Sequence, residues 1–199
     1  MSRLAIVDSG GANIASLLFA FERLGVTAEL TTKAETIRTA PRVVLPGVGA
    51  AGDAMQRLRD AQLIDVVREL RQPVLGICLG MQLLCEASEE EDVECLGIVP
   101  GIARRLTVSE GLAVPNMGWC ATHPLRAHPV LPATDQGSRF YFLHSSARPG
   151  GAATIATALH TQECAAAIAR DNFFAAQFHP ERSSQAGATL LANCLQWQA

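Results

Sequence analysis

The sequence predicts an α/β fold, with a mostly parallel sheet that carries helices on both faces and an antiparallel extension. Two patterns support this prediction. Up to residue 87, short apolar runs alternate with segments whose apolar residues recur at helical spacing, as in parallel strands joined by helices. The rest of the chain changes to short β-rich runs, which favour antiparallel pairing. With 199 residues, the chain is expected to form a single domain, residues 1–199, around one main core.

The individual elements follow from turn residues and apolar spacing. Asn13 is expected to cap the first helix and Gly25 to end it, while Ser183 or Ser184 is expected to cap the last one. The predicted strands lie at residues 4–7, 28–31, 43–45, 74–77, 102–106, 140–143, 154–159, 165–169 and 173–178. The predicted helices lie at residues 14–24, 51–70, 81–87 and 185–197.

Composition argues against several functional classes. Hydrophobic residues make up 49% of the chain and charged residues 18%, which is enough apolar material for a core and too little charge for disorder. The formal net charge is -3 and the basic residues are dispersed, so we expect no nucleic-acid partner and no membrane partner. The only early apolar run, residues 4–7, is too short for a signal peptide or a spanning helix, which favours a cytoplasmic location.

The six cysteines lack the spacing of a metal site. They contain no C-x-x-C pair and lie at positions 78, 85, 95, 120, 164 and 194. We therefore expect no metal and no cofactor. Most of these cysteines are expected to be reduced, buried packing residues.

The strongest chemical signal is an apolar strand that runs into G-x-C-x-G. Residues 74–77 lead to Cys78, which Gly76 and Gly80 flank, and a helix-like segment follows. This is the strand-turn-helix nucleophile elbow with cysteine in place of serine. The glycines leave room for a sharp turn that lifts the sulfur above the sheet edge, and the following helix N-terminus favours negative charge. An isolated cysteine is more often a packing residue, but these flanks favour a catalytic role for Cys78.

A second signal directly follows the predicted strand at 173–178. His179 and Glu181 stand there as a proton donor and the carboxylate that would hold its tautomer. Taken alone, His179 would fit a loop start and Glu181 a solvated first-turn acid. Both signals lie at carboxyl ends of predicted strands, however, and that edge is where open α/β sheets bind ligands. We therefore expect the two to share one site.

A glycine-rich stretch lies between the strand at 43–45 and the next helix. Residues 47–52 contain G-x-G-x-x-G, which suggests dinucleotide binding. That site needs an acid at the end of the next strand, and the next strand ends at Cys78 instead. Backbone N–H groups beside a cysteine nucleophile can serve as donors to an oxyanion. Val48, Gly49 and Leu79 are the candidates for such an oxyanion hole.

These residues resemble the class I, triad-type glutamine amidotransferases, whose two signatures read here G-I-C-L-G-M-Q and Q-F-H-P-E. Cys78, His179 and Glu181 fall on the catalytic positions of that family. Almost end to end, the chain is most similar to the glutamine amidotransferase subunits of imidazole glycerol phosphate synthase. That likeness rests on P-G-V-G at 46–49, P-x-M-G-W at 115–119, Y-F-L-H-S at 141–145 and H-P-E-R-S at 179–183.

The resemblance implies a flavodoxin-like fold and hydrolysis of L-glutamine to L-glutamate and ammonia. The ammonia would pass to a separate cyclase subunit, in a heterodimer, which makes imidazole glycerol phosphate and aminoimidazole carboxamide ribotide in histidine biosynthesis. It also implies that glutamine is bound by Gly47, Gln82, Ser145 and Ser146. The same carry-over places three residues near the cyclase interface, Asn13, Trp119 and Arg182.

Four positions depart from the commonest form of the subunit: Ser9, Ala12, Cys120 and Ser146. They bear on the partner interface more than on the chemistry. In the family, the P-G-V-G segment is thought to complete the oxyanion hole only when the cyclase holds its substrate. We therefore expect very weak turnover by the isolated chain.

Three other functions compete with this one. A glutaminase subunit for a different ammonia acceptor would share the triad, but P-x-M-G-W and H-P-E-R-S argue against it. A cysteine hydrolase of related fold, acting on peptides or esters, would also use Cys78 and His179. A non-catalytic binding module, with Asp8 and the glycine loops at its binding edge, is disfavoured by the intact Cys, His and Glu set.

Overall fold

The computed structural model describes residues 3–10, 14–132 and 137–199, so the expected cap Asn13 and the departure Ala12 lie outside the described residues. The helices are α1 (Ile14–Arg23), α2 (Ala34–Thr39), α3 (Ala51–Asp60), α4 (Ile64–Arg68), α5 (Leu79–Leu83) and α6 (Ser184–Gln196), with single 3-10 turns η1 (Glu90–Asp92) and η2 (Pro180–Arg182). The strands are β1 (Arg3–Val7), β2 (Thr27–Thr31), β3 (Arg42–Leu45), β4 (Val74–Ile77), β5 (Ala87–Ser88), β6 (Val93–Glu94), β7 (Ile102–Arg105), β8 (Asn116–Pro124), β9 (Arg139–His144), β10 (Ser146–Ala147), β11 (Thr154–Leu159), β12 (Glu163–Arg170) and β13 (Phe173–Ala176).

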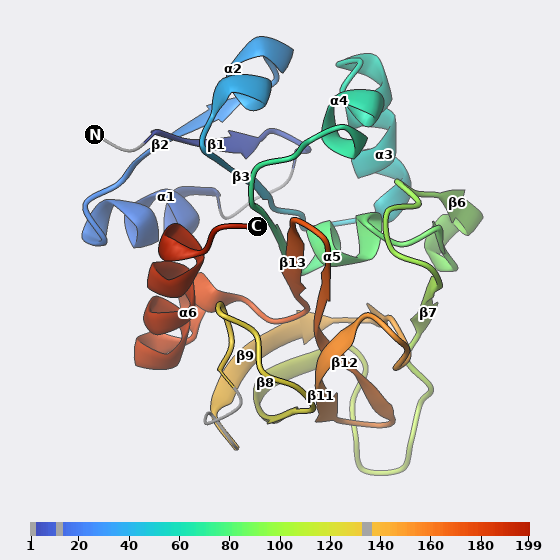
Figure 1. Cartoon of the computed structure of the whole chain (residues 1–199). Coiled ribbons are helices and arrows are strands. Elements are labelled where there is room, and N and C mark those ends of the chain that lie inside the picture. Colours follow the sequence, from blue (N-terminus) through green and yellow to red (C-terminus); the bar gives the residue numbers. More distant parts are fainter. Residues whose placement is uncertain (1–2, 11–13, 133–136) are drawn as a thin grey trace.

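A nine-stranded sheet with the order β2-β1-β3-β4-β13-β12-β11-β8-β9 runs through the molecule (Figure 1). The strands from β2 to β13 in this order pair in parallel. From β13 onward the pairs are antiparallel. The predicted α/β fold class, with its parallel sheet and antiparallel extension, is therefore confirmed. No helix in the described part of the chain is both long and apolar enough to cross a membrane.

Both faces of β1, β3, β4 and β13 are buried, as the apolar composition of these strands requires, whereas the edge strand β2 is mostly exposed. Along β1, Leu4 and Ile6 point into one core, together with residues of α1 and α6. Their neighbours Ala5 and Val7 point into the other core, together with residues of α3 and α4. Successive side chains of a strand alternate between faces, so one four-residue apolar run supplies both cores. Figure 1 shows α1 and α6 together on one side of the sheet and α3 and α4 on the other.

The helix predicted over residues 51–70 is wrong in one respect, because the structure divides it into α3 and α4. The break lies at Gln62, whose φ is 56°. Glutamine rarely takes this left-handed conformation, and no glycine or proline marks the break in the sequence. Helix α2 was not predicted; it is six residues long, and Ile37 is its only buried residue. The helix predicted at 81–87 begins earlier, at Leu79, and ends at Leu83.

Two expectations about strands are corrected by long-range pairing. The run at 102–106 does not extend the main sheet, because β7 belongs to a second, four-stranded sheet of order β10-β7-β5-β6. Strand β13 does not lie wholly in the antiparallel region, because it pairs in parallel with β4. Strand β8, which carries the M-G-W motif, was not predicted. Its sequence mixes polar residues, glycine and proline, so it shows no clear apolar alternation.

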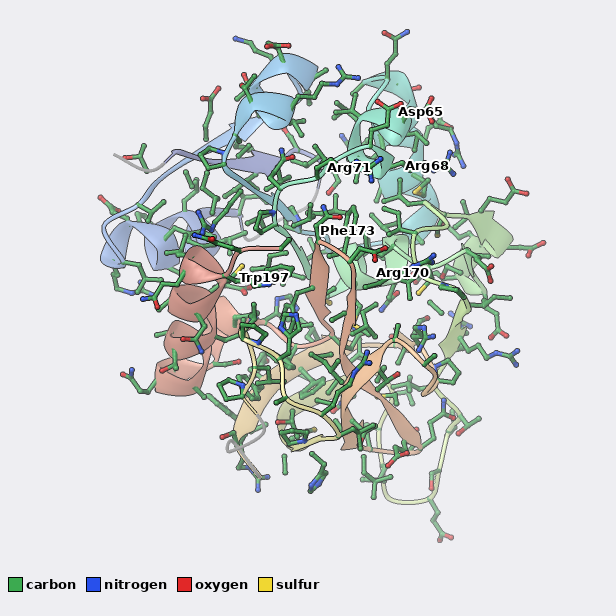
Figure 2. The ribbon with its side chains drawn as sticks, in the orientation of Figure 1. Asp65, Arg68, Arg71, Arg170, Phe173 and Trp197 are labelled. Carbon is green, nitrogen blue, oxygen red and sulfur yellow. The ribbon has the colours of Figure 1, made fainter. Side chains whose placement is uncertain are left out.

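The pairing of β4 with β13 brings the two sequence signals to one edge. Ala176, the last residue of β13, lies opposite Ile77, the last residue of β4. The Cys78 N–H continues the ladder by donating to the Ala176 carbonyl oxygen at 2.8 Å. The carboxyl edge of β4 and β13 is therefore where the site forms. At the opposite end of β13, Phe173 lines a separate hollow with arginines 68, 71 and 170 (Figure 2).

Candidate active site

Cys78 occupies a strained turn between β4 and α5. Its φ of 53° and ψ of -110° lie outside the regions that a non-glycine residue normally occupies, and such strain concentrates at functional positions. The turn leaves no room for side chains around it. A Cβ on Gly80 would lie 1.8 Å from the Leu45 carbonyl oxygen, and one on Gly76 would lie 2.8 Å from the Ala175 Cβ. Both glycines of the G-x-C-x-G motif are therefore required by space.

His179 follows β13 with an unstrained backbone, at φ -102° and ψ 96°. Its Nδ1 and the Glu181 Oε1 lie 2.8 Å apart, and each of these side chains is only 4% exposed. The backbone on either side is also fixed: the His179 N–H donates to the Tyr141 carbonyl oxygen at 2.8 Å, and the Ser183 hydroxyl donates to the His179 carbonyl oxygen at 2.6 Å. Because Nδ1 donates to the carboxylate, Nε2 is the ring nitrogen that remains for the sulfur and a substrate.

The surroundings of His179 favour its protonated form. Burial by itself lowers the pKa of His179, but the adjacent Cys78 sulfur and the Glu181 carboxylate both stabilise an imidazolium and raise the pKa to about 10. At neutral pH the ring is therefore a proton carrier. Together with the sulfur and the carboxylate, it can act as a general acid toward a leaving group.

A cavity of about 240 Å³ opens over the sulfur. Its lining residues are Val48, Gly49, Cys78, Leu79, Gln82, Glu90, Pro115, Leu143, His144, Ser145, Ser146 and His179. The structure thus brings together the expected nucleophile, the base, both expected loop residues and three of the four expected glutamine contacts. Within the described residues, no three His, Cys, Asp or Glu side chains form a group that could hold a metal ion.

The sequence interpretation missed one cavity residue, Glu90. Among the described residues of the lining it is the only acidic one, and it comes from η1. In the sequence it stands in an acidic run, residues 89–92, which normally indicates a solvated surface. Only the chain path from α5 through the second sheet brings this acid over the cavity.

The glycine-rich loop packs directly on the elbow. The Leu79 N–H, a candidate oxyanion donor, donates to the Gly47 carbonyl oxygen at 3.3 Å. Gly47, an expected glutamine contact, therefore lies behind the elbow rather than in the cavity lining, and a Cβ there would come within 2.8 Å of the Leu79 Cβ. Ser9, one of the departures, anchors the loop by donating to the Pro46 carbonyl oxygen at 2.8 Å. In this conformation the Leu79 donor is already occupied.

Two of the three expected interface residues meet at one aromatic ring. The Arg182 guanidinium lies 4.4 Å from the centroid of the Tyr141 ring, and Trp119 contacts the same ring edge-on with centroids 6.2 Å apart. Trp119 is 45% exposed, and Met117 on the same face of β8 is 65% exposed. An apolar surface therefore lies next to the turn that carries Glu181.

The fold and this site define an α/β protein with cysteine, histidine and glutamate gathered at the carboxyl edge of its sheet. The model of the glutamine amidotransferase class-I family matches residues 5–197, so the chain belongs to this family. It is similar to the imidazole glycerol phosphate synthase subunit HisH of Xanthomonas axonopodis pv. citri, with 47% identity over 98% of each chain. The subunit of the same name from Xylella fastidiosa is 46% identical over 100% of each chain.

Solved structures show the same architecture. PurLQS from Thermotoga maritima superposes with a TM-score of 0.73 at 19% identity, covering 98% of this chain and 97% of that one. A glutamine amidotransferase from the same organism gives a TM-score of 0.68 at 14% identity, covering 98% of this chain and 96% of that one. At these identities the likeness supports the fold.

Proposed function

We propose that this chain is the glutaminase subunit of an imidazole glycerol phosphate synthase. It hydrolyses L-glutamine to L-glutamate and ammonia, and the ammonia passes to a separate cyclase subunit that makes imidazole glycerol phosphate and aminoimidazole carboxamide ribotide in histidine biosynthesis. The observation that carries the proposal is the strained Cys78 in one cavity with His179, whose ring is bound to Glu181. Near 47% identity with HisH over the full chain supports this particular ammonia acceptor.

The reaction follows from the three side chains. The Cys78 thiolate attacks the side-chain amide carbon of glutamine and forms a tetrahedral intermediate. The protonated His179 gives its Nε2 proton to the amide nitrogen, which leaves as ammonia and yields a thioester. A water molecule, deprotonated by the now neutral His179, attacks the thioester and releases glutamate. Glu181 holds the ring orientation and balances its charge throughout.

Substrate binding uses the polar groups that line the cavity beside Cys78 and His179. Glu90 supplies a negative charge for the α-ammonium group of glutamine. Gln82 and the segment at Ser145 and Ser146 supply polar groups for the rest of its amino-acid end. The Ser146 hydroxyl is buried and has no hydrogen-bond partner among the described residues, so it is available to a ligand.

The oxyanion hole requires a rearrangement of the glycine-rich loop. The Leu79 N–H must leave the Gly47 carbonyl oxygen before it can stabilise the oxyanion, with Val48 and Gly49 as the loop donors. The loss of one such donor lowers turnover by about 100- to 1,000-fold. This predicts weak turnover by the chain alone and activation when the cyclase binds its substrate.

We assign the cyclase interface to the surface of Trp119 and Arg182, with Asn13 as a third contact. We assign the protein to the cytoplasm, and its six free thiols support this location.

Glutamate release by wild type and Cys78→Ala tests the proposal, with the cyclase and its nucleotide ligand absent and then present. Cys95→Ala, which removes a buried thiol outside the cavity lining, is the matched control. We expect wild type and the control to be active only with both components and Cys78→Ala to be silent. Turnover by Cys78→Ala, or no stimulation of wild type, would reject the triad or the assigned acceptor respectively.

A further inference from the structure

A buried network of hydrogen-bonded side chains runs along the cavity wall and reaches the Cys78 sulfur. It begins at the Ser146 carbonyl oxygen, which can only accept. The Gln82 Nε2 donates to this oxygen at 2.8 Å, and the His144 Nδ1 donates to it at 3.0 Å. A side-chain amide has two ends that differ in chemistry, so this one carbonyl fixes how Gln82 is turned.

The orientation of Gln82 in turn fixes that of Gln177. The second hydrogen of the Gln82 Nε2 points to the Gln177 Oε1 at 3.1 Å. The Gln177 Nε2 is therefore directed at the Cys78 sulfur, at a distance of 3.8 Å. Gln177 is completely buried and lies outside the cavity lining, so its amide cannot exchange these partners for water.

The orientations of the side chains at the other end of this hydrogen-bonded network are fixed in the same way. Because the His144 Nδ1 carries the hydrogen, its Nε2 accepts from the Asn116 Nδ2 at 3.1 Å. Burial lowers the pKa of His144 to about 4, so the ring keeps this neutral tautomer at physiological pH. The Asn116 Oδ1 then accepts from the Cys120 thiol at 3.6 Å. Each of these side chains between β8 and Cys78 therefore has a single orientation, fixed from the Ser146 carbonyl oxygen outward in both directions.

We propose that Gln177 is a further catalytic residue, which donates a hydrogen bond from its Nε2 to the Cys78 sulfur and stabilises the thiolate. This proposal rests on the proposed function, because it takes Cys78 as the nucleophile. Besides the His179 ring, the sulfur faces the Leu143 carbonyl oxygen at 3.5 Å, which can accept from a thiol but repels a thiolate. Gln177 is the neutral donor that compensates for this, and Gln82 and Ser146 hold it in place.

The test is the pH dependence of Cys78 alkylation by iodoacetamide, followed on the Cys78 peptide by mass spectrometry in wild type and Gln177→Leu. Losing a hydrogen bond to a charged sulfur should raise the pH of half-maximal alkylation by about one unit, a roughly tenfold loss of rate at lower pH. The other ionisable groups lining the cavity, Glu90, His144 and His179, are unchanged in this variant.

Gln72→Leu is the matched control. The Gln72 Nε2 also donates to two backbone carbonyl oxygens, those of residues 37 and 38, but Gln72 lies outside the cavity lining. Its alkylation profile should match wild type. An unchanged profile in Gln177→Leu would overturn the proposal while leaving Cys78 as the nucleophile. Cys78 that reacts no faster than buried Cys164 in wild type would instead remove the proposed function and this inference together.

A second measurement covers the case in which Gln177→Leu does not fold. In wild type, the side-chain amide protons of Gln177 should shift in NMR spectra with the same midpoint as Cys78 alkylation. The amide protons of Gln72 should not. A Gln177 signal that does not respond to pH across the alkylation midpoint would overturn the proposal without any variant.

Discussion

Cys78 and His179, the proposed nucleophile and base, lie at the ends of neighbouring parallel strands, yet they are held in different ways. Cys78 is placed by its main chain: a left-handed φ, close backbone contacts and two glycines without room for a Cβ. His179 has a relaxed backbone and is placed by the Glu181 carboxylate and the Ser183 hydroxyl. The first region depends on shape and the second on polar contacts. Substitutions should therefore act through sterics on one side and through charge and pH on the other.

The largest expected effect is that of Gly80→Ala. The new Cβ would meet the Leu45 carbonyl oxygen at 1.8 Å, so the backbone has to move, and we expect the free energy of unfolding to fall by about 3 kcal/mol or more. Gly150→Ala is the control, because nothing lies within 4 Å of its Cβ, and it should change stability by less than about 0.5 kcal/mol. Equal urea midpoints for the two variants would show that space does not hold the nucleophile.

Glu181→Gln should act on turnover and on the pH response. Loss of the carboxylate that orients and charges His179 should lower glutaminase turnover with the partner by about 100-fold or more. The exposed Glu35→Gln variant is the control and should keep wild-type turnover. A Glu181→Gln variant with full turnover would mean that the base is not held electrostatically.

Glu181→Gln should also change how the free energy of unfolding depends on pH. The pKa of His179 is about 10 in the folded chain against an ordinary 6.5, so the folded chain holds the extra proton between these values. The resulting stabilisation is fully present below about pH 6.5 and is lost as pH rises through about 10. Removing the Glu181 charge should flatten this decline, which urea denaturation between pH 6 and 10.5 would detect. A decline as steep as in wild type would contradict the assignment.

The smallest effect expected is that of Ser183→Ala. The Ser183 hydroxyl accepts from the Tyr141 N–H at 2.9 Å and donates to the His179 carbonyl oxygen. Its loss removes the acceptor of the Tyr141 N–H and should reduce stability by about 2 kcal/mol. The exposed neighbour Ser184→Ala should change stability by less than about 0.5 kcal/mol. A similar thermal midpoint for both variants would show that this hydroxyl does not fix the turn.

The same contrast separates what the sequence could predict from what it could not. The elbow was predictable because its apolar strand, glycines and cysteine are adjacent in sequence. The two serines expected to cap α6 illustrate the opposite case: Ser183 makes no side-chain cap hydrogen bond, because its hydroxyl bonds to His179 and Tyr141 instead. The contact with Tyr141, a residue of the distant strand β9, cannot be predicted from the local capping pattern.

Glu90 and Gln177 show the same limit within the site. Glu90 stands in an acidic run, and Gln177 follows an apolar strand, so neither carries a local sign of a cavity or of a contact with sulfur. Their positions depend on pairings between distant segments, such as Gln177 with Gln82. The break between α3 and α4 at Gln62 could not be predicted for a different reason: no sequence pattern marks a glutamine with a left-handed backbone conformation.

The position of β13 within the sheet determines when the sheet can close during synthesis of the chain. It is the last strand along the described chain, yet it lies inside the sheet between β4 and β12. A nascent polypeptide that has emerged only through β12 carries the thiol but lacks the imidazole, and its β4 and β12 present open edges with unpaired backbone groups. Under the proposed mechanism such an unfinished chain cannot hydrolyse glutamine, and its open strand edges favour association. Translation order would thus restrict ammonia release to chains whose sheet has closed.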